Sequence, residues 1–183
     1  LCEKPAVLKK AQAEELYSLA KENNVVFMEA VKTAYCPGFH AMMAAAKSGK
    51  IGRIIDVEAA FSRLTPVNTR EYMAQDYNGS FLEFGSYVCM PVFELLGCDY
   101  DDVRFHSMRA VNGVDAYTKA VFSFGGKSAE VKTGLGVKTE GQLLISGTNG
   151  YILAKSPWWL TKEFEIRYED PNKKEVYKYA YEG

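Results

Sequence analysis

The sequence is poor in the residues that build metal sites and disulfide frameworks. Its 183 residues include two histidines and four cysteines, and Cys2, Cys36, Cys89 and Cys98 form no C-x-x-C pair. Without further histidines or regular cysteine spacing, we expect no metal site and no disulfide scaffold. The thiols are interpreted as reduced, which predicts a protein of a reducing compartment, the cytoplasm.

An excess of charge of one sign is also missing. The chain carries 22 basic and 23 acidic residues, a formal net charge of -1, and no run of one sign. Binding to a nucleic acid or to an anionic membrane requires a concentrated basic face, so neither partner is expected. The apolar stretches are well short of the roughly 20 residues that span a bilayer, which excludes a transmembrane segment.

What remains is the composition of a globular protein, with 48% apolar and 25% charged residues. The chain begins Leu1-Cys2-Glu3-Lys4-Pro5, without an initiator methionine or a signal segment, and it stops at Tyr181-Glu182-Gly183, directly after a strand-like run. We therefore expect both ends to be cuts through a longer protein.

The first thirty residues have the pattern of a helix followed by a strand. Apolar residues recur at three-to-four spacing over 6–22, and Asn23-Asn24 provides a stop. The continuous apolar run 25–30 is typical of a buried parallel strand. We interpret 1–30 as the C-terminal remnant of a dinucleotide-binding, Rossmann-type domain, and 31–183 as a second domain, truncated at its C-terminus.

The second domain begins with helical patterns on either side of one strand. Apolar spacing predicts helices over Phe39–Lys47 and Ser80–Leu96, and Pro91 is expected to kink or split the second. Strict alternation predicts a half-buried strand over Ile55–Phe61. A polar loop is expected over 63–78.

From residue 103 onward the chain reads as strands separated by turn signals. Gly125-Gly126, Asn149-Gly150 and Asp170-Pro171-Asn172 are hairpin-type connectors, and short connectors imply antiparallel neighbours. The fold class is therefore α+β, an open and mainly antiparallel sheet with helices on one face. The expected strands are Val103–Val111, Ala116–Phe124, Ser128–Val137, Gln142–Ser146, Tyr151–Lys155, Lys162–Tyr168 and Glu175–Tyr181.

Two motifs contain residues that can move or stabilise a proton. The first is Glu3-Lys4-Pro5, where the proline restricts the backbone of Lys4 and aims its ammonium from a stiff corner. The second is 79–87, where Glu83 and Tyr87 are four residues apart and share one helix face. A tyrosine there can exchange a proton with a carbonyl or alcohol, provided that a nearby cation lowers its pKa from about 10. Alternatively, Lys4 is a surface lysine and Tyr87 a buried residue bonded to Glu83.

Taken in order, these motifs resemble the Gfo/Idh/MocA family of oxidoreductases over essentially the whole chain. The matching pieces are Cys2-Glu3-Lys4-Pro5, Met28-Glu29-Ala30, Pro37, the turn 48–54 and the segment 79–87. The resemblance implies a glycine-rich phosphate loop upstream and NAD or NADP as cofactor. The only GxG, Gly134–Gly136, sits in a late strand with no helix after it, so it is not that loop.

The resemblance also implies roles for individual residues. Lys4 matches the active-site lysine beside the nicotinamide, within the cofactor-binding corner Glu3, Lys4 and Pro5. Tyr87 stands where many members carry histidine; the glucose–fructose oxidoreductase and dihydrodiol dehydrogenase branches carry tyrosine. Glu83 replaces a usual aspartate, and Tyr35 is a candidate for lining the substrate pocket.

Three functions follow from these observations. The first is an NAD(P)-dependent oxidoreductase of sugars, cyclitols or related polyols, represented here by a fragment, in which Lys4, Tyr87 and Glu83 act on a small-molecule substrate. The second is a non-catalytic module that binds or dimerises through its sheet, and the resemblance implies a homodimer or higher homo-oligomer in either case. The third is a glycosidase with Glu29 and Glu83 as its carboxylate pair. Trp158-Trp159 either stacks on a sugar or packs against a neighbour.

Overall fold

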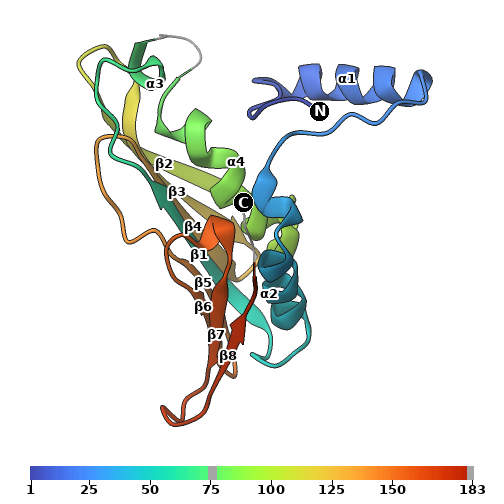
Figure 1. The fold of residues 1–183 in the computed structure, drawn as a ribbon, viewed down its shortest axis with the longest axis vertical. Coiled ribbons are helices and arrows are strands. Elements are labelled where there is room, and N and C mark those ends of the chain that lie inside the picture. Colours follow the sequence, from blue (N-terminus) through green and yellow to red (C-terminus); the bar gives the residue numbers. More distant parts are fainter. Residues whose placement is uncertain (74–77, 181–183) are drawn as a thin grey trace.

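A computed structural model describes residues 1–73 and 78–180, and one sheet of eight strands dominates these ranges (Figure 1). The strand order is β2-β3-β4-β1-β5-β6-β7-β8. Only β1 and β4 pair in parallel, and the other neighbours are antiparallel. The strands are β1 Ile54–Ser62, β2 Asp102–Arg109, β3 Asp115–Phe124, β4 Lys127–Gly134, β5 Leu143–Gly147, β6 Tyr151–Ala154, β7 Glu163–Arg167 and β8 Lys174–Lys178.

The predicted α+β class and its mainly antiparallel sheet are confirmed. The three predicted connectors join β3 to β4, β5 to β6 and β7 to β8. The first is Gly125-Gly126, where both glycines have positive φ, the conformation that tight hairpin turns require. Every strand expected between residues 55 and 180 is present, with its ends shifted by a few residues.

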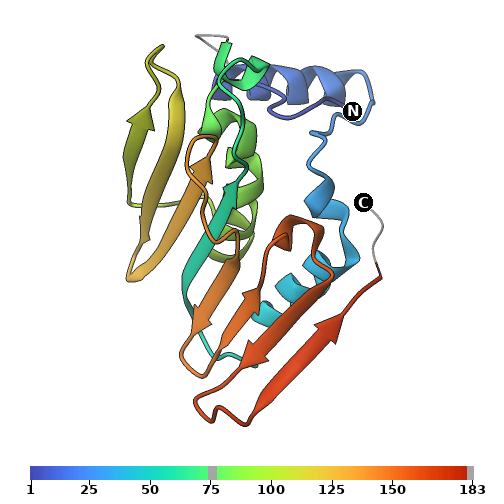
Figure 2. The same cartoon turned by 60° about the vertical axis from the view of Figure 1, so that its left-hand side comes forward.

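Two helices cover one face of the sheet (Figure 2). α2 spans Pro37–Lys47 and α4 spans Ser80–Leu96, as the apolar spacing predicted. Buried residues of both helices pack on inward-facing residues of the strands to form the main core, which includes Phe39, Met42, Val88, Val92, Val57, Val131, Ile145 and Ile166. No helix of the described residues is long and apolar enough to cross a bilayer.

Proline does not interrupt α4. Pro91 is buried within a helix that continues to Leu96, so the predicted split does not occur. The ring removes the donor to the carbonyl of Tyr87. Packing of Val88 and Val92 in the core on either side of the proline holds the helix together despite that lost bond.

The N-terminal segment differs most from expectation. The helix α1 spans Lys10–Glu22, beginning after the predicted residue 6, and Gln12 Oε1 accepts bonds from the N–H groups of Leu8 and Lys9. The expected buried strand at 25–30 is reduced to a parallel bridge between Cys2 and Glu29. Val26 is 80% exposed because no described element covers it. The prediction of burial is therefore wrong for this chain, and the boundary at residue 30 stays a prediction.

The predicted loop at 63–78 contains one helical turn. α3 spans Arg70–Met73, and the side chain of Tyr72 is buried in a small second core with Phe84 and Leu135. Positions 74–77 of this loop and 181–183 at the end of the last predicted strand lie outside the described residues.

A carboxylate of the sheet fixes the start of α4. Asp115 Oδ2 in β3 accepts hydrogen bonds from Ser80 Oγ at 2.7 Å and from the N–H of Phe81 at 2.9 Å. Gly79, with φ of 121°, precedes the helix, and a Cβ at this position would overlap the Asp115 carboxylate. A glycine is required here, and the bonds lock the rotation of α4 on the sheet.

Replacing Asp115 should therefore loosen the helix that carries Glu83 and Tyr87. We expect Asp115→Ala to lower the free energy of unfolding by about 1–3 kcal/mol, because two donors at the helix N-terminus lose their acceptor. Denaturant unfolding measures this change. Asp99→Ala, an exposed substitution, is the control, and equal stabilities of the two variants would contradict the role of Asp115.

Candidate functional site

Lys4, Glu83 and Tyr87, residues far apart in the sequence, line one cavity. Its volume is about 390 Å³, and it opens between the N-terminal segment, the end of β1, α4 and the loop after β6. The sequence interpretation required the ammonium and the phenol to converge, and the structure brings them together. The described residues that line it are Lys4, Lys32, Phe61, Ser62, Arg63, Glu83, Phe84, Tyr87, Lys138, Ser156 and Trp159.

Lys4 is held at the cavity by its backbone and by its side chain. The N–H of Cys2 donates to the carbonyl of Met28 at 2.9 Å, and the N–H of Ala30 donates to the carbonyl of Cys2 at 2.7 Å. These bonds fix the chain just before Lys4, whose peptide with Pro5 is cis. The ammonium of Lys4 is 2.9 Å from Glu83 Oε1 and donates to the Glu83 carbonyl at 2.7 Å.

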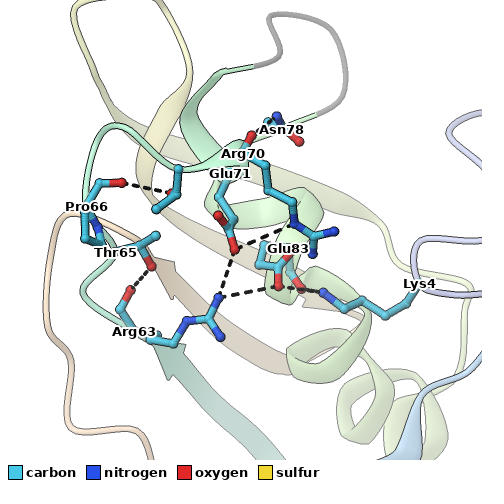
Figure 3. A network of polar contacts seen from close by, with 9 residues as sticks. Lys4, Arg63, Thr65, Pro66, Arg70, Glu71, Asn78 and Glu83 are labelled. Atoms are coloured by element: carbon cyan, nitrogen blue, oxygen red, sulfur yellow. Dashed lines mark hydrogen bonds and ion pairs between the residues drawn. The ribbon is translucent and has the colours of Figure 1, made fainter.

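Glu83 is the centre of a chain of ion pairs (Figure 3). Its Oε1 also lies 3.9 Å from Arg63 Nη2. Arg63 Nη2 is 3.1 Å from Glu71 Oε1, which in turn lies 3.9 Å from Arg70 Nε. The loop after β1 is thereby connected to α4 and to Lys4. The pKa of Glu71 is lowered by its hydrogen bonds to backbone and Thr69 and by the neighbouring arginines, so it is a stable anion.

Tyr87 faces the same cavity from one turn further along α4. Its side chain is 9% exposed, and the ammonium of Lys4 is 5.9 Å from the ring centroid. Burial raises the pKa of Tyr87, and the nearby carboxylates of Glu83, Glu3 and Glu29 raise it further. The sequence interpretation made proton exchange conditional on a nearby cation that lowers this pKa. In the structure burial and the three carboxylates raise the pKa, so that condition is not met.

The wall beside these groups is a stack of aromatic rings. Phe61 of β1 lies between Trp159, at a centroid distance of 3.6 Å, and Phe84, at 4.3 Å, and both are stacked on it. Tyr87 meets Phe61 edge to face at 5.3 Å. Trp158 is fully buried, and its Nε1 donates to the carbonyl of Ala60 at 2.8 Å. The sequence left open whether these tryptophans stack on a sugar or pack against a neighbour. In the structure Trp158 packs in the core, and Trp159 lines the cavity.

The structure explains why a glycine interrupts this helix. Gly85 is buried, and a Cβ built on it would lie 3.2 Å from Cδ1 of Phe81, one turn earlier. Close packing within the helix therefore accounts for the glycine. Gly85 accommodates a ring of its own helix.

The remaining candidates lie around the cavity. Pro5 lines an adjoining hollow with Glu83 and Arg70. Glu29 accepts a bond from Ser86 Oγ at 2.9 Å, on the same helix as Tyr87. Tyr35 is 56% exposed, its hydroxyl contacts Met28 Sδ at 3.9 Å, and it is not part of the cavity lining.

Sequence reasoning missed several cavity residues. Phe61 appeared only as an alternating strand residue, and Arg63, Lys32 and Lys138 lie on or beside connecting segments that carry no motif. Alternation along β1 placed Phe61 on the helix-covered face, which was the one available signal. For Arg63, Lys32 and Lys138 the sequence contained no such signal, because residues of connecting segments converge only once the sheet is formed.

Comparison with known proteins agrees with this geometry. A family model described as the GFO/IDH/MocA C-terminal domain matches residues 39–153, more than half of the chain, and the chain belongs to this family of oxidoreductases. A scyllo-inositol 2-dehydrogenase (NADP(+)) of Bacillus subtilis is 29% identical over 180 residues, covering 93% of this chain and 53% of the relative. A trans-1,2-dihydrobenzene-1,2-diol dehydrogenase of Bos taurus is 26% identical, covering 92% and 51%.

Solved structures show the same fold. A 3-ketoreductase from Actinomadura kijaniata, in complex with NADP and TDP-benzene, matches with a TM-score of 0.80 at 22% identity, over 97% of this chain and 56% of that one. An NAD binding oxidoreductase from Klebsiella pneumoniae matches with a TM-score of 0.80 at 16% identity, over 96% and 52%. The chain thus spans about half the length of the relatives it matches.

The residues present fit one end of a nicotinamide dinucleotide. The sequence has no glycine-rich loop that follows a strand and opens a helix, which a diphosphate would need. Lys4 instead places a cation beside the phenol of Tyr87, at a cavity walled by aromatic rings. This donor set matches the reacting end of such a cofactor, where Lys4 and Pro5 would lie against it.

The raised pKa of Tyr87 can be measured directly. We expect the ultraviolet difference titration between the wild type and Tyr87→Phe to show one tyrosinate that forms above pH 10, because burial and the three carboxylates oppose ionisation. Tyr17→Phe, at an exposed position, shows whether a single phenol is resolved. A difference midpoint below pH 10 would mean that Lys4 controls the phenol after all.

Proposed function

We propose that this chain is the substrate-side half of an NAD(P)-dependent oxidoreductase of sugars, cyclitols or related polyols. The observation that carries the proposal is the convergence of Lys4, Glu83 and Tyr87 on one cavity. Membership of an oxidoreductase family supports it, as do relatives named for inositol and diol substrates. Residues 1–30 would complete the nucleotide-binding domain, and the four free thiols fit a reducing cytoplasm.

The aromatic wall suits a ring-shaped polyol. Phe61 and Trp159, which are both partly exposed, offer apolar surface to the C–H face of such a ring, while Glu83 and Ser62 offer acceptors and donors to its hydroxyls. A volume of about 390 Å³ falls within the range of small-molecule sites. Substrate binding and orientation therefore use groups from β1, α4 and the loop that carries Trp159.

The chemistry can be assigned to named atoms. The nicotinamide, when bound, supplies or accepts the hydride at the reacting carbon. In the reducing direction the Tyr87 hydroxyl gives its proton to the carbonyl oxygen as that oxygen becomes a hydroxyl, and Lys4 stabilises the negative charge that develops there. Oxidation of an alcohol reverses these transfers. Because burial and carboxylates keep the phenol protonated, the site as it stands favours the role of proton donor.

The sheet provides a second candidate, a surface for self-association. The face opposite α2 and α4 is not covered by any described helix, and it carries alternating charges. Lys119 pairs with Glu130 at 2.5 Å, and Lys132 pairs with Glu130 and Glu140 at 3.5 and 2.9 Å. We propose a homodimer through this face, compatible with the enzyme and with a non-catalytic module alike.

Removing either proton-handling group should abolish most turnover. In the whole protein we expect Tyr87→Phe and Lys4→Ala each to lower kcat/KM on its polyol by about 10²–10⁴-fold, the usual contribution of a positioned acid or charge. Steady-state kinetics with NAD(H) and NADP(H) measure the loss. Lys10→Ala, on the exposed face of α1, is the control and should keep normal rates. Near-normal rates in either site variant would refute the assignment.

The chain alone should bind nicotinamide dinucleotides poorly. Most of the affinity for such cofactors comes from a phosphate loop at a helix N-terminus, and this sequence contains none. Titration calorimetry of the 183-residue chain with NADH and with NADPH is expected to show no saturation in the micromolar range. Micromolar affinity would place the dinucleotide site within these residues.

A further inference from the structure

The cavity carries more positive than negative charge. Among its described lining residues are the cations Lys4, Lys32, Arg63 and Lys138, and Glu83 is the one carboxylate. A neutral polyol needs hydroxyl-binding groups but no such surplus. The excess of positive charge must therefore be explained by the charge of the molecule that binds there.

Two of these cations have no carboxylate partner within the described residues. Lys4 pairs with Glu83, and Arg63 pairs with Glu71. Lys32 forms no ion pair there, and Lys138 has only the carbonyl of Ser62, at 3.4 Å from its Nζ. Ammonium groups on a concave wall raise the local concentration of anions. Each ammonium group has three N–H donors, so Lys32 and Lys138 can each donate hydrogen bonds to a bound anion.

The backbone around both lysines is fixed by hydrogen bonds. Thr33 Oγ1, next to Lys32, donates to the carbonyl of Trp159 at 2.7 Å. The N–H of Thr139, next to Lys138, donates to Ser62 Oγ at 2.7 Å. Lys32 and Lys138 are thus anchored beside Trp159 and Ser62, on separate segments that both line the cavity.

Glu83 and Tyr87 belong to the helix at the Phe84 side of the aromatic stack. Trp159 and Phe84 contact opposite sides of Phe61, and Phe84 belongs to the same helix as Glu83 and Tyr87. A ring along this stack would have one edge near Tyr87 and Lys4. Its opposite edge would face Trp159, beside which Lys32 is anchored, and Lys138 lines the same cavity from Ser62.

We propose that the substrate is a polyol bearing an anionic group, a carboxylate or a phosphate monoester, and that Lys32 and Lys138 bind this group. The inference rests on the proposed oxidoreductase function and adds the charge of its substrate. Lys32 and Lys138 determine specificity: they hold the anion and so place the carbon to be oxidised or reduced beside Tyr87.

Kinetics on a matched substrate series test the proposal in the whole protein. A hexose, its hexuronate and its 6-phosphate are compared in the wild type and in Lys32→Gln/Lys138→Gln. Lys127→Gln/Lys173→Gln, at two hairpin turns outside the cavity, is the control with the same change of charge. We expect kcat/KM for one anionic sugar to exceed that for the hexose by tenfold or more, and this ratio to fall about tenfold in the cavity variant only.

A binding measurement separates this inference from the oxidoreductase proposal. Titration of the same proteins with the hexuronate and the hexose 6-phosphate, without cofactor, should show affinity that drops about tenfold in the cavity variant. The stronger of the two ligands identifies the anion. If anion binding is lost in the variant but nothing turns over, the oxidoreductase proposal fails and the anion site stands. Turnover of the hexose with equal efficiency, or a ratio unchanged in the cavity variant, overturns the inference.

Discussion

The ion pair between Lys4 and Glu83 is the contact on which the site depends. It joins the N-terminal segment to α4 across 79 positions of sequence, and its side chains are only 12% and 19% exposed. Two charges removed from water must compensate one another, and here the ammonium gains a second acceptor, the Glu83 carbonyl, while the carboxylate gains Arg63. Either group alone would be left poorly solvated. The pair therefore fixes Lys4 and Glu83 at the cavity, in addition to any part they take in the proposed reaction.

The same contact explains a departure from the family pattern. The resemblance implies an aspartate where this chain has Glu83. With one more methylene, the carboxylate extends from α4 to Lys4 and comes within 3.9 Å of Arg63. Arg63 is in turn held by Glu71 on the short helix α3. The longer side chain thus connects the loop after β1 to the corner of Lys4, a structural role added to any contact with a substrate hydroxyl.

The electrostatics of Tyr87 follow from what surrounds it. Glu83, Glu3 and Glu29 lie close enough to raise its pKa, and Lys4, at 5.9 Å from the ring, is itself paired with one of them. A cation already neutralised by a carboxylate has little effect left for a neighbouring phenol. The sequence made proton exchange depend on a cation beside the phenol, but burial first and the nearby carboxylates second decide the direction in which its pKa shifts.

The limits of sequence reasoning in this chain have physical causes. Hairpins and helices of the second domain were predictable, because periodicity and turn residues such as Gly125-Gly126 are local signals. Lys4 and the helix face of Tyr87 were recognisable through their motifs. The exposure of Val26 depends on elements that the local pattern does not contain. The place of Trp159 against Phe61 depends on a contact across the sheet, which no short-range pattern encodes.

The distribution of groups between rigid elements and connecting segments suggests how such a site can change its substrate. Glu83 and Tyr87 stand on α4, which Asp115 locks to the sheet, so their mutual geometry is set by the core. Lys32 and Lys138 stand outside the long helices and the strands, where substitutions disturb few packed contacts. The geometry of the proposed proton transfer is therefore constrained by packing, whereas the charge that Lys32 and Lys138 bring to the cavity can change without repacking the core. A fold arranged in this way keeps one reaction and varies what it acts upon.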